Sequence, residues 1–475
     1  MVRFSFHPFG AMAQQIALSN RTPLKKFILR QGSELLTDLA GLALVGMALN
    51  RFAQVRQTLD RLLPKRSGQS VGELVIAYVG LLCTGKSDFE AIENHRQDDA
   101  FAQLLGLSGV PAASTLRMQL DAQAEGLMPH VDELSVPLLQ HAGAPITPLA
   151  CGWVPVDIDV FTLDNSGTRK DGVSRTYAGT DGFAPIAAYV GQEGWCLSLE
   201  LRDGSWHSAQ ETAYTLERTL PRAQALTAAP LLVRWDSGFH ALALAHDIEA
   251  ASRARPATGG QPIHFWVKGN PRGLDVEAFH AERLDTGAIA CLPRAGKRFW
   301  IWETLETDTR QPQNLTFRRI HRVIERTGDR RGQVLWLPEL EYAFWDTTLP
   351  DRFPPSAVID LYADHGTHEP FHSEFKTELD LERLPSGQFA TNDLILSLAM
   401  LAYNVLRLMG QSALLSDDAP VRHPAKRRRL KTVIQELITV SAKRVKHARQ
   451  TFLNFGRHCP AFRVFHRLYD AWSTA

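Results

Sequence analysis

The chain has 475 residues, 44% of them hydrophobic and 22% charged, and its formal net charge at pH 7 is +1. This composition is ordinary for a globular protein of two to four domains and excludes a collagen-like or disordered chain. The five cysteines are scattered, odd in number and without Cys-x-x-Cys or Cys/His spacing. This usage excludes a disulfide framework and a structural zinc site, and it favours a reduced, cytoplasmic protein.

Residues 20 to 140 are predicted to be helical, because apolar residues recur there at helical spacing. The apolar run at 35–49 contains Asp38 and is shorter than the roughly 20 residues of a membrane helix. We therefore expect a buried helix there and no membrane contact, and no secretory signal is visible. The segments 102–107 and 113–124, separated by a short turn, predict either a helix-turn-helix that presents Arg117 to DNA or an ordinary helical hairpin.

The segment Gly80–Ser87 matches the pattern G-x4-G-K-[ST] of a phosphate-binding P-loop. A P-loop follows a strand of a parallel sheet, whereas the sequence on both sides of this segment has a helical pattern. A P-loop NTPase that uses these residues therefore stays an alternative, from the class of nucleotide hydrolases.

From residue 152 the pattern changes to short β-prone runs with helices between them. Three strands, a helix, a strand, a helix and a strand are predicted at 154–160, 185–190, 196–201, 209–219, 231–235, 241–251 and 263–267. This order, with a helix further on, predicts an α/β (α+β) fold with an RNase H-like core. Further strands are predicted at 298–304, 315–326 and 334–345, and an apolar helix at 393–408.

These patterns divide the chain into five parts. We expect a helical N-terminal domain for DNA binding or dimerisation, the first part of the core, a β-rich insertion, the last part of the core and a basic C-terminal helical region. Their expected bounds are 1–145, 150–269, 270–355, 356–412 and 413–475.

Acidic residues lie on or directly after two of the predicted strands. Asp157 and Asp159 alternate with apolar residues, so one face of their strand is acidic and the other apolar. Asp236 follows the run 231–235, at the strand end where ligands gather in α/β sheets, although a helix N-cap is the structural alternative. Because an ionised carboxylate is costly to bury unless it is paired or bound to metal, these residues are candidate metal ligands.

A third carboxylate lies in the segment from Tyr362 to Lys376. Glu369 and Lys376 are seven residues apart, about two turns of an α-helix, so both side chains leave the same helix face. A carboxylate on that face can hold a metal while the ammonium group binds a phosphate.

This segment resembles the third-acid motif of DDE transposases of bacterial insertion sequences, Tyr-x2-Arg-x3-Glu-x6-Lys. Tyr362, Glu369 and Lys376 match the motif, and His365 stands at the arginine position. The strand with Asp159 and the strand end with Asp236 are similar to the family's first and second aspartate segments. Among the insertion-sequence transposases, the chain looks like a member of family thirteen-eighty, which belongs to the family-four-like superfamily.

The resemblance implies a transposase that cleaves DNA at transposon ends and transfers the strand into a target. Asp159, Asp236 and Glu369 would hold two Mg²⁺ or Mn²⁺ ions, with Asp157 as the alternative to Asp159. Tyr362, His365 and Lys376 would position DNA phosphates. The implied partners are terminal inverted repeats and target DNA, bound by a homodimer in a synaptic complex at the nucleoid. A catalytically inactive relative that only binds DNA is the second alternative.

Two further groups of residues are candidates for DNA contact. Residues 422–449 hold ten Lys and Arg against one acidic residue, with their densest run at Arg427, Arg428 and Arg429. Such a cluster binds the DNA backbone by releasing counterions, and a solvated tail is the alternative. Trp300 and Trp302 share one face of a predicted strand with basic neighbours, so they either stack on an unpaired base or pack in a core.

Overall fold

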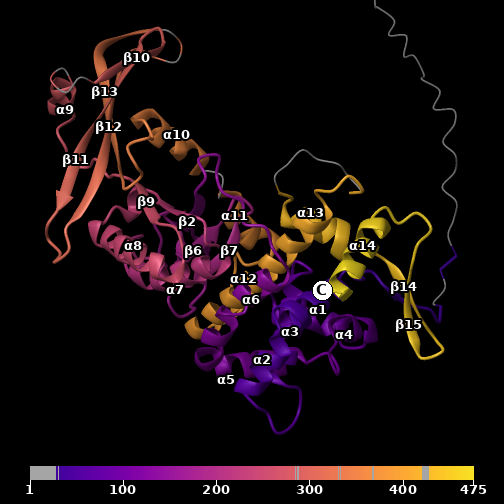
Figure 1. Cartoon of the computed structure of the whole chain (residues 1–475). Helices are drawn as coiled ribbons and strands as arrows, with labels where there is room; N and C mark the ends of the chain where they lie inside the picture. The colour runs from indigo at the N-terminus through magenta and orange to yellow at the C-terminus, as the bar shows by residue number, and fades with distance from the viewer. Residues whose placement is uncertain are drawn as a thin grey trace, which may run out of the picture.

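The computed structural model describes residues 28–29, 32–283, 285, 288–329, 331, 333–365, 369–419 and 427–474. For Thr258, residues 362–365 and Glu369 it describes the backbone alone. The fold is a mixture of helices and a large mixed sheet. Figure 1 shows a group of N-terminal helices, a central sheet with flanking helices, and a long β-sheet that projects from the body.

The N-terminal region is helical, as the apolar periodicity predicts. Its elements are β1 (Leu35–Thr37), α1 (Leu42–Met47), the π-helical turn η1 (Ala48–Phe52), α2 (Val55–Leu62), α3 (Val71–Leu82), the 3-10 helix η2 (Phe89–His95), α4 (Asp99–Leu105), α5 (Ala113–Asp132) and α6 (Ser135–His141). Every residue of α3 is buried, and Ser70 caps its N-terminus by accepting a hydrogen bond from the Glu73 amide at 3.3 Å.

The P-loop alternative is wrong, because the matching segment lacks the required context. Gly80 lies inside α3, where a Cβ would meet the Leu105 side chain at 2.4 Å. Helices stand on both sides of the segment, and Ser87 donates its hydroxyl to the Asp380 carbonyl at 2.6 Å. A helix occupies the place of the strand that a phosphate-binding loop needs.

Nine strands form the central sheet in the order β10-β11-β12-β13-β9-β8-β2-β6-β7. Its core elements are β2 (Val154–Val160), β6 (Ile186–Val190), β7 (Trp195–Glu200), α7 (Thr212–Leu226), β8 (Leu231–Trp235), the 3-10 turn η3 (Ser237–Phe239), α8 (Leu242–Ala254), the 3-10 turn η4 (Arg255–Thr258) and β9 (Ile263–Lys268). β2 runs parallel to β8, β8 runs parallel to β9, and β6 runs antiparallel to β2. A separate small sheet contains β3 (Leu163–Asp164), β5 (Asp181–Phe183) and β4 (Ser174–Arg175).

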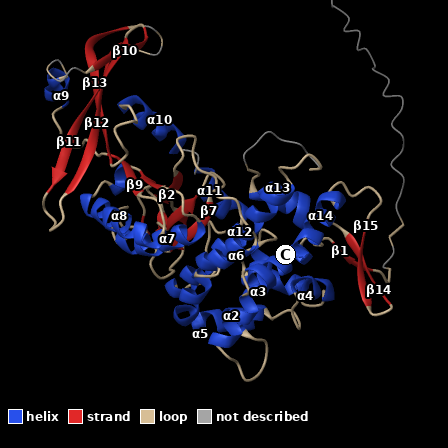
Figure 2. Cartoon of the chain, viewed as in Figure 1, coloured by secondary structure: helices blue, strands red, loops and turns tan. Residues whose placement is uncertain are grey.

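The projecting sheet continues the central one. It consists of α9 (Val276–Glu282), β10 (Ile289–Arg294), β11 (Lys297–Asp308), β12 (Leu315–Gly328) and β13 (Val334–Thr347). β13 joins β9 through an antiparallel pairing at Trp345–Thr347, so the strands predicted between 298 and 345 extend the central sheet at its β9 edge (Figure 2).

The last helices return to the body of the molecule. They are α10 (Pro355–His365), α11 (Glu369–Ser373), the π-helical turn η6 (Glu374–Glu378), α12 (Phe389–Ala413), α13 (Leu430–Val433) and the π-helical turn η7 (Ile434–Ile438), followed by β14 (Ala442–His447), β15 (Gln450–Phe455) and α14 (Phe462–Thr474). α12 packs against β7 and against α3, α5 and α6, so it connects the sheet to the N-terminal helices. It is long and apolar enough to cross a membrane, but 94% of its most apolar window is buried inside the fold.

The C-terminal region departs from the predicted all-helical structure. Residues 442–455 form a β-hairpin whose first strand pairs with β1. The tight turn at Ala448 and Arg449 has positive φ angles of 48° and 67°, which suit the twist of a two-residue hairpin loop. Pairing with a strand some 400 positions earlier is not visible in local periodicity, so sequence patterns alone missed it.

Candidate active site

Asp159 and Asp236 lie side by side at the carboxyl ends of two parallel strands. In the pairing of β2 with β8, Asp157 is opposite Arg234. Extending this register by two residues places Asp159 next to Asp236, on the same face of the sheet because side chains alternate along a strand. The parallel strands therefore present two carboxylates at the edge where α/β sheets bind ligands.

Local hydrogen bonds orient one oxygen of each of these aspartates. The Asp159 Oδ1 accepts from the Val160 amide at 2.8 Å, and the Asp236 Oδ1 accepts from the Gly238 amide at 2.8 Å. The second bond caps the turn η3, so Asp236 is an N-cap, the structural alternative considered for it. A carboxylate has several acceptor positions, so capping leaves the other Asp236 oxygen able to bind a ligand.

Tyr177 contacts the end of β2 beside Asp159. It donates a hydrogen bond to the Val160 carbonyl at 3.2 Å. Partial burial of the hydroxyl, followed by the negative charges of Asp159 and Asp236, raises the pKa of Tyr177.

Asp157 has a different environment from Asp159, although the two are only two residues apart. Its carboxylate accepts two hydrogen bonds from the Arg234 guanidinium, Nε to Oδ1 at 2.6 Å and Nη2 to Oδ2 at 2.8 Å. Both side chains are buried, with 7% and 1% exposed. A bidentate buried pair compensates the charge of Asp157, so Asp159 is the better candidate ligand on this strand.

His372 is a residue of this site that the sequence patterns did not single out. Its Nδ1 lies 3.8 Å from the Asp159 Oδ2, and its ring stacks on Phe161 with centroids 4.7 Å apart and planes 18° apart. His372 follows Glu369 by three positions on α11. The spacing Glu-x-x-His, one helical turn, is the signal that could have identified it.

Of the four residues of the predicted motif, only Lys376 has a side chain that the structure describes. Tyr362 and His365 lie on α10 and Glu369 is the first residue of α11, but their side chains are outside the described residues. Because His372 is one turn after Glu369 and contacts Asp159, the backbone of Glu369 is near the end of β2. Lys376 lies on η6, with its Nζ 6.0 Å from the Phe161 ring centroid and 4.0 Å from the Glu382 Oε2.

Two buried glutamates fix this helix to the C-terminal region. Glu374 forms an ion pair with Arg407, and its Oε1 accepts from the Leu430 amide at 3.1 Å. Glu378 pairs with Arg429 and accepts from the Lys431 amide at 2.8 Å. Burial raises the pKa of Glu374, and the Arg407 charge opposes that shift.

The run Arg427–Arg429, predicted to bind DNA, makes contacts within the protein, although its burial is uneven: Arg428 is buried, Arg427 is half-buried and Arg429 is exposed. Arg427 lies over the Phe371 ring at 4.2 Å. Arg428 is buried and pairs with Glu436 at 3.2 Å. Arg429 also donates to the Ser373 Oγ at 2.8 Å. Arg427 and Arg428 are thus the less accessible members of the run, and their DNA contact stays a prediction together with that of Arg429.

Three other predicted DNA contacts are also engaged within the protein. The Arg117 Nη2 donates to both carboxylate oxygens of Glu90, at 2.9 Å to Oε1 and 2.7 Å to Oε2. Trp300 and Trp302 are 9% and 4% exposed; Trp302 stacks on His321, and Arg283 covers Trp300. The core-packing alternative fits both tryptophans better than base stacking does, because an enclosed ring has no face for a base.

A search of the described residues finds no group of three or more His, Cys, Asp and Glu side chains that could hold a metal ion. The Glu369 side chain is outside that search. The donors that are present, two adjacent carboxylates at strand ends, fit a hard divalent cation, which takes oxygen ligands.

A family model for transposase DDE domain group 1 matches residues 28–254 and 297–474. The chain belongs to this transposase family. The match includes both aspartates, Glu369, His372 and Lys376, and it omits 255–296, which holds β9, α9 and β10. The chain is thus a member of a family of DNA transposition enzymes.

Outside this family model, the similarity of the chain to a solved structure is distant. No curated protein matches the chain. Among solved structures it is similar to a piggyBac transposase synaptic complex with hairpin DNA, at 9% identity and a TM-score of 0.37, over 85% of this chain and 80% of that chain. A similarity this distant carries no argument about mechanism.

Proposed function

We propose that this transposase cuts DNA at the ends of a mobile element and joins them to target DNA, using divalent metal ions held by Asp159, Asp236 and Glu369. The observation that carries the proposal is the pair Asp159 and Asp236 at adjacent parallel strand ends, with α11 packed beside them. The strand order β7-β6-β2-β8-β9, with β6 antiparallel, supports an RNase H-like core.

The proposed reaction is an in-line displacement at phosphorus, with water or a 3′-hydroxyl as the nucleophile and Mg²⁺ or Mn²⁺ as the metal. Two such ions would activate the attacking oxygen and stabilise the leaving oxygen. The residues of the chain bind and orient. Asp159 and Asp236 each keep one oxygen on a backbone amide, which fixes the direction of the other. Lys376, near Phe161, supplies a cation for a DNA phosphate.

Phe161 and His372 form one wall of the proposed site. Their stacked rings lie between Lys376 and Asp159, so the imidazole fixes the carboxylate from one side. This wall restricts the rotation of the Asp159 side chain, and groups that orient a ligand in this way commonly matter for metal affinity.

A DNA-cleavage assay tests the proposal. The full-length protein is incubated with Mg²⁺ or Mn²⁺ and supercoiled DNA that carries the element's ends. We expect nicking that EDTA abolishes and that falls at least about 100-fold in Asp159→Asn, Asp236→Asn and Glu369→Gln. Glu125→Gln, an exposed carboxylate on α5, is the control and should cut like the parent.

Either of two results would contradict the proposal. One is metal-independent nicking, and the other is undiminished nicking by Glu369→Gln. Binding of the same DNA without any cleavage by the parent protein would instead support the catalytically inactive relative.

A further inference from the structure

The exposed positive charge of the C-terminal region is concentrated on the hairpin β14–β15 and on α14. The sequence has no acidic residue between Glu436 and Asp470. The same stretch contains seven Lys and Arg residues, namely Lys443, Arg444, Lys446, Arg449, Arg457, Arg463 and Arg467. Figure 1 shows the hairpin at the edge of the molecule, away from the central sheet.

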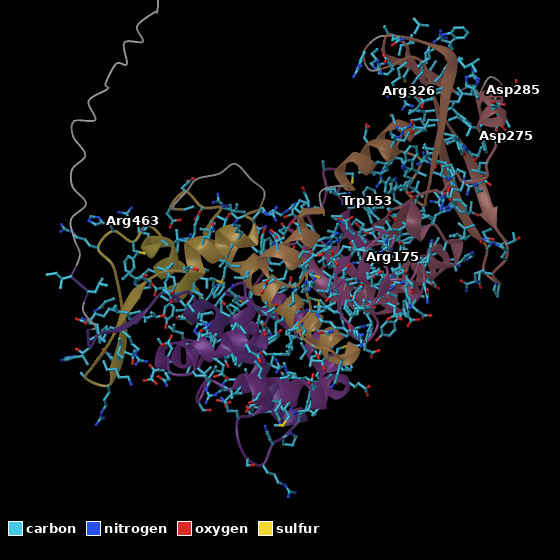
Figure 3. All side chains as sticks on the ribbon, turned by 180° about the vertical axis from the view of Figure 1, so that it is seen from behind. Trp153, Arg175, Asp275, Asp285, Arg326 and Arg463 are labelled. Carbon is cyan, nitrogen blue, oxygen red and sulfur yellow. The ribbon has the colours of Figure 1, made fainter. Side chains whose placement is uncertain are left out.

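Three of these seven charges are paired within the protein. Lys443 lies 4.0 Å from Glu34, Arg444 lies 3.4 Å from Asp99, and Arg467 lies 3.0 Å from Asp418. The other four are exposed and have no ion pair with a residue that the structure describes; they are Lys446, Arg449, Arg457 and Arg463. Their charge is available to an anionic partner, and Figure 3 labels one of the four, Arg463.

The hairpin has the dimensions of a DNA-reading ribbon. Each strand has six residues, about 20 Å at 3.4 Å per residue. β1 pairs only with Ala442–Arg444, so the outer half of the hairpin extends beyond its neighbouring strand. The major groove of B-DNA admits a two-stranded β-ribbon of this kind.

The tip of the hairpin holds a cation in an unfavourable backbone conformation. Arg449 has a φ angle of 67°, in the left-handed region, where glycine or asparagine is favoured in a two-residue hairpin loop. An arginine at this position costs stability and places a guanidinium at the point of the hairpin that is furthest from the body. The neighbouring Ala448 also has a positive φ, of 48°, so the feature specific to Arg449 is its exposed charge at the turn.

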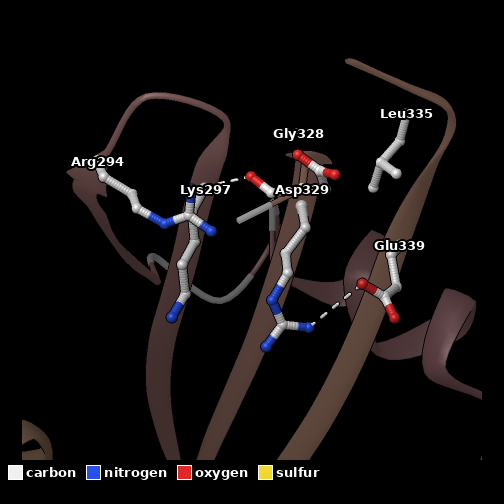
Figure 4. A pocket seen from close by; sticks show the side chains of 7 residues that line it. Arg294, Lys297, Gly328, Asp329, Leu335 and Glu339 are labelled. Carbon is white, nitrogen blue, oxygen red and sulfur yellow. Dashed lines mark hydrogen bonds and ion pairs between the residues drawn. The ribbon is translucent and has the colours of Figure 1, made fainter. Parts of the chain in front are cut away.

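Other basic groups of the molecule are less suited to bind an anionic partner. At the far end of the projecting sheet, a cavity of about 700 Å³ is lined by Arg294, Lys297 and Arg326 but also by Asp329 and Glu339. Arg326 pairs with Glu339 at 3.7 Å, an ion pair drawn in Figure 4. It also pairs with Glu341 at 2.5 Å. Acidic residues thus lie among the cations at that end and pair with Arg326, whereas the sequence of the hairpin itself contains no acidic residue.

We propose that the tip of the β14–β15 hairpin, through Lys446 and Arg449, binds the phosphate backbone of double-stranded DNA, with the hairpin entering the major groove. The proposal rests on the proposed function only in taking DNA as the partner. It adds the hairpin to the DNA contact predicted for Arg427–Arg429.

Fluorescence anisotropy with the full-length protein and a labelled duplex of random sequence tests the proposal over a series of salt concentrations. Losing two phosphate contacts in Lys446→Ala/Arg449→Ala should reduce the slope of log K against log salt by about 1.8 and weaken binding on the order of tenfold. The matched control is Lys65→Ala/Arg66→Ala, which removes two exposed cations between α2 and α3 and should leave both values unchanged.

Two glycine substitutions at the hairpin turn separate the effect of the Arg449 charge on DNA binding from the effect of the backbone conformation on stability. Arg449→Gly should raise the Tm, because it relieves the positive φ, and should still weaken DNA binding. Ala448→Gly, at φ 48°, should raise the Tm and bind DNA like the parent. An unchanged salt slope in Lys446→Ala/Arg449→Ala, or an equal loss in the Lys65→Ala/Arg66→Ala control, would overturn the proposal.

The cleavage rate at saturating DNA distinguishes a failure of the hairpin proposal from a failure of the proposed function. If the hairpin only binds, Lys446→Ala/Arg449→Ala should nick DNA with metal at the parental rate once DNA is saturating, and a lower rate there would overturn a pure binding role. If the parent protein does not nick DNA at all, the proposed function fails, while the change in salt slope still decides the role of the hairpin.

Discussion

At the scale of single residues, the role of each aspartate on β2 depends on which residue in or directly after the neighbouring strand β8 lies beside it. Asp157 and Asp159 share a strand face, and local sequence does not distinguish them. The cross-strand register places Arg234 opposite the first and Asp236 beside the second. The sequence predicted an acidic face and left the choice open, because the partner arginine is 77 positions away and the register is not encoded locally.

Replacing each aspartate by asparagine should therefore have a different effect: the change at Asp157 should lower stability, and the change at Asp159 should remove cleavage. Asp157→Asn leaves the buried Arg234 charge without its partner and should cost about 3–5 kcal/mol of stability, seen as a lower Tm. Asp159→Asn should leave the Tm near that of the parent and abolish cleavage. Equal thermal stability of the two variants would contradict this division of roles.

His372 should matter through its nitrogen more than through its ring. His372→Phe keeps an aromatic ring against Phe161 but removes the Nδ1 that faces Asp159. We expect a Tm close to the parent's and a cleavage rate roughly 10–100-fold lower, the usual loss for a group that orients a metal ligand. Parental cleavage by this variant would show that the imidazole is only packing.

At the scale of elements, the segment 369–378 departs from the single α-helix that the spacing of Glu369 and Lys376 predicts. It begins as α11 and continues as the π-helical turn η6. Glu374 and Glu378 lie in this turn; Glu374 pairs with the buried Arg407 of α12, and Glu378 pairs with Arg429, which is half exposed. The wider turn coincides with these long-range pairs, which the local α-helical period does not predict. Short π-helical turns inside helices recur at functional sites.

The pair between Glu374 and Arg407 should be a large contributor to the stability of this helix. Glu374→Gln leaves the fully buried Arg407 guanidinium without a compensating charge, which should lower stability by roughly 3–5 kcal/mol. Denaturant unfolding measures this loss. Replacing both partners, as Glu374→Leu/Arg407→Met, should recover most of it, and a double variant as unstable as the single one would argue against a charge-pair origin.

The start of α12 should make stability depend on pH. Burial raises the pKa of Asp393 from 3.8 to about 6, while its Oδ1 accepts from the Leu201 amide at 2.8 Å. Since the folded-state pKa is the higher one, the contribution of this carboxyl is complete below pH 3.8 and is lost as the pH rises through about 6. The loss is about 3 kcal/mol for a shift of this size.

Asp393→Asn removes that titration but keeps an oxygen for the Leu201 amide. Relative to the parent, this variant should gain stability between pH 4 and pH 8, measured by urea unfolding at each pH. A difference in stability that is the same at both pH values would mean that Asp393 does not titrate in this range.

At the scale of the whole molecule, the strands and helices of the central sheet were predictable and their assembly was not. The run Leu231–Trp235 gave β8 with its observed bounds, and the apolar segment 393–408 lies inside α12. Both are continuous apolar runs, for which local pattern is sufficient. Pairing of β13 with β9 and of β14 with β1 depends on distant partners.

In the candidate site, too, some features were predictable from the sequence and others were not. The motif residues were found because their spacing is local, whereas the environment of Asp157, His372 and Arg427 is created by packing between distant segments. The charge count located the basic C-terminal segment correctly. Which of its cations are buried and which are exposed became visible only in the fold.

The central claim is that Asp159, Asp236 and Glu369 hold one metal centre. Fe²⁺ bound in place of Mg²⁺, with ascorbate and peroxide, generates radicals that cut the backbone near the ion. We predict cuts in the full-length protein near residues 159, 236 and 369, which excess Mg²⁺ should suppress and which Asp159→Asn should lose. Cuts elsewhere in the chain, or the same cuts in that variant, would contradict it.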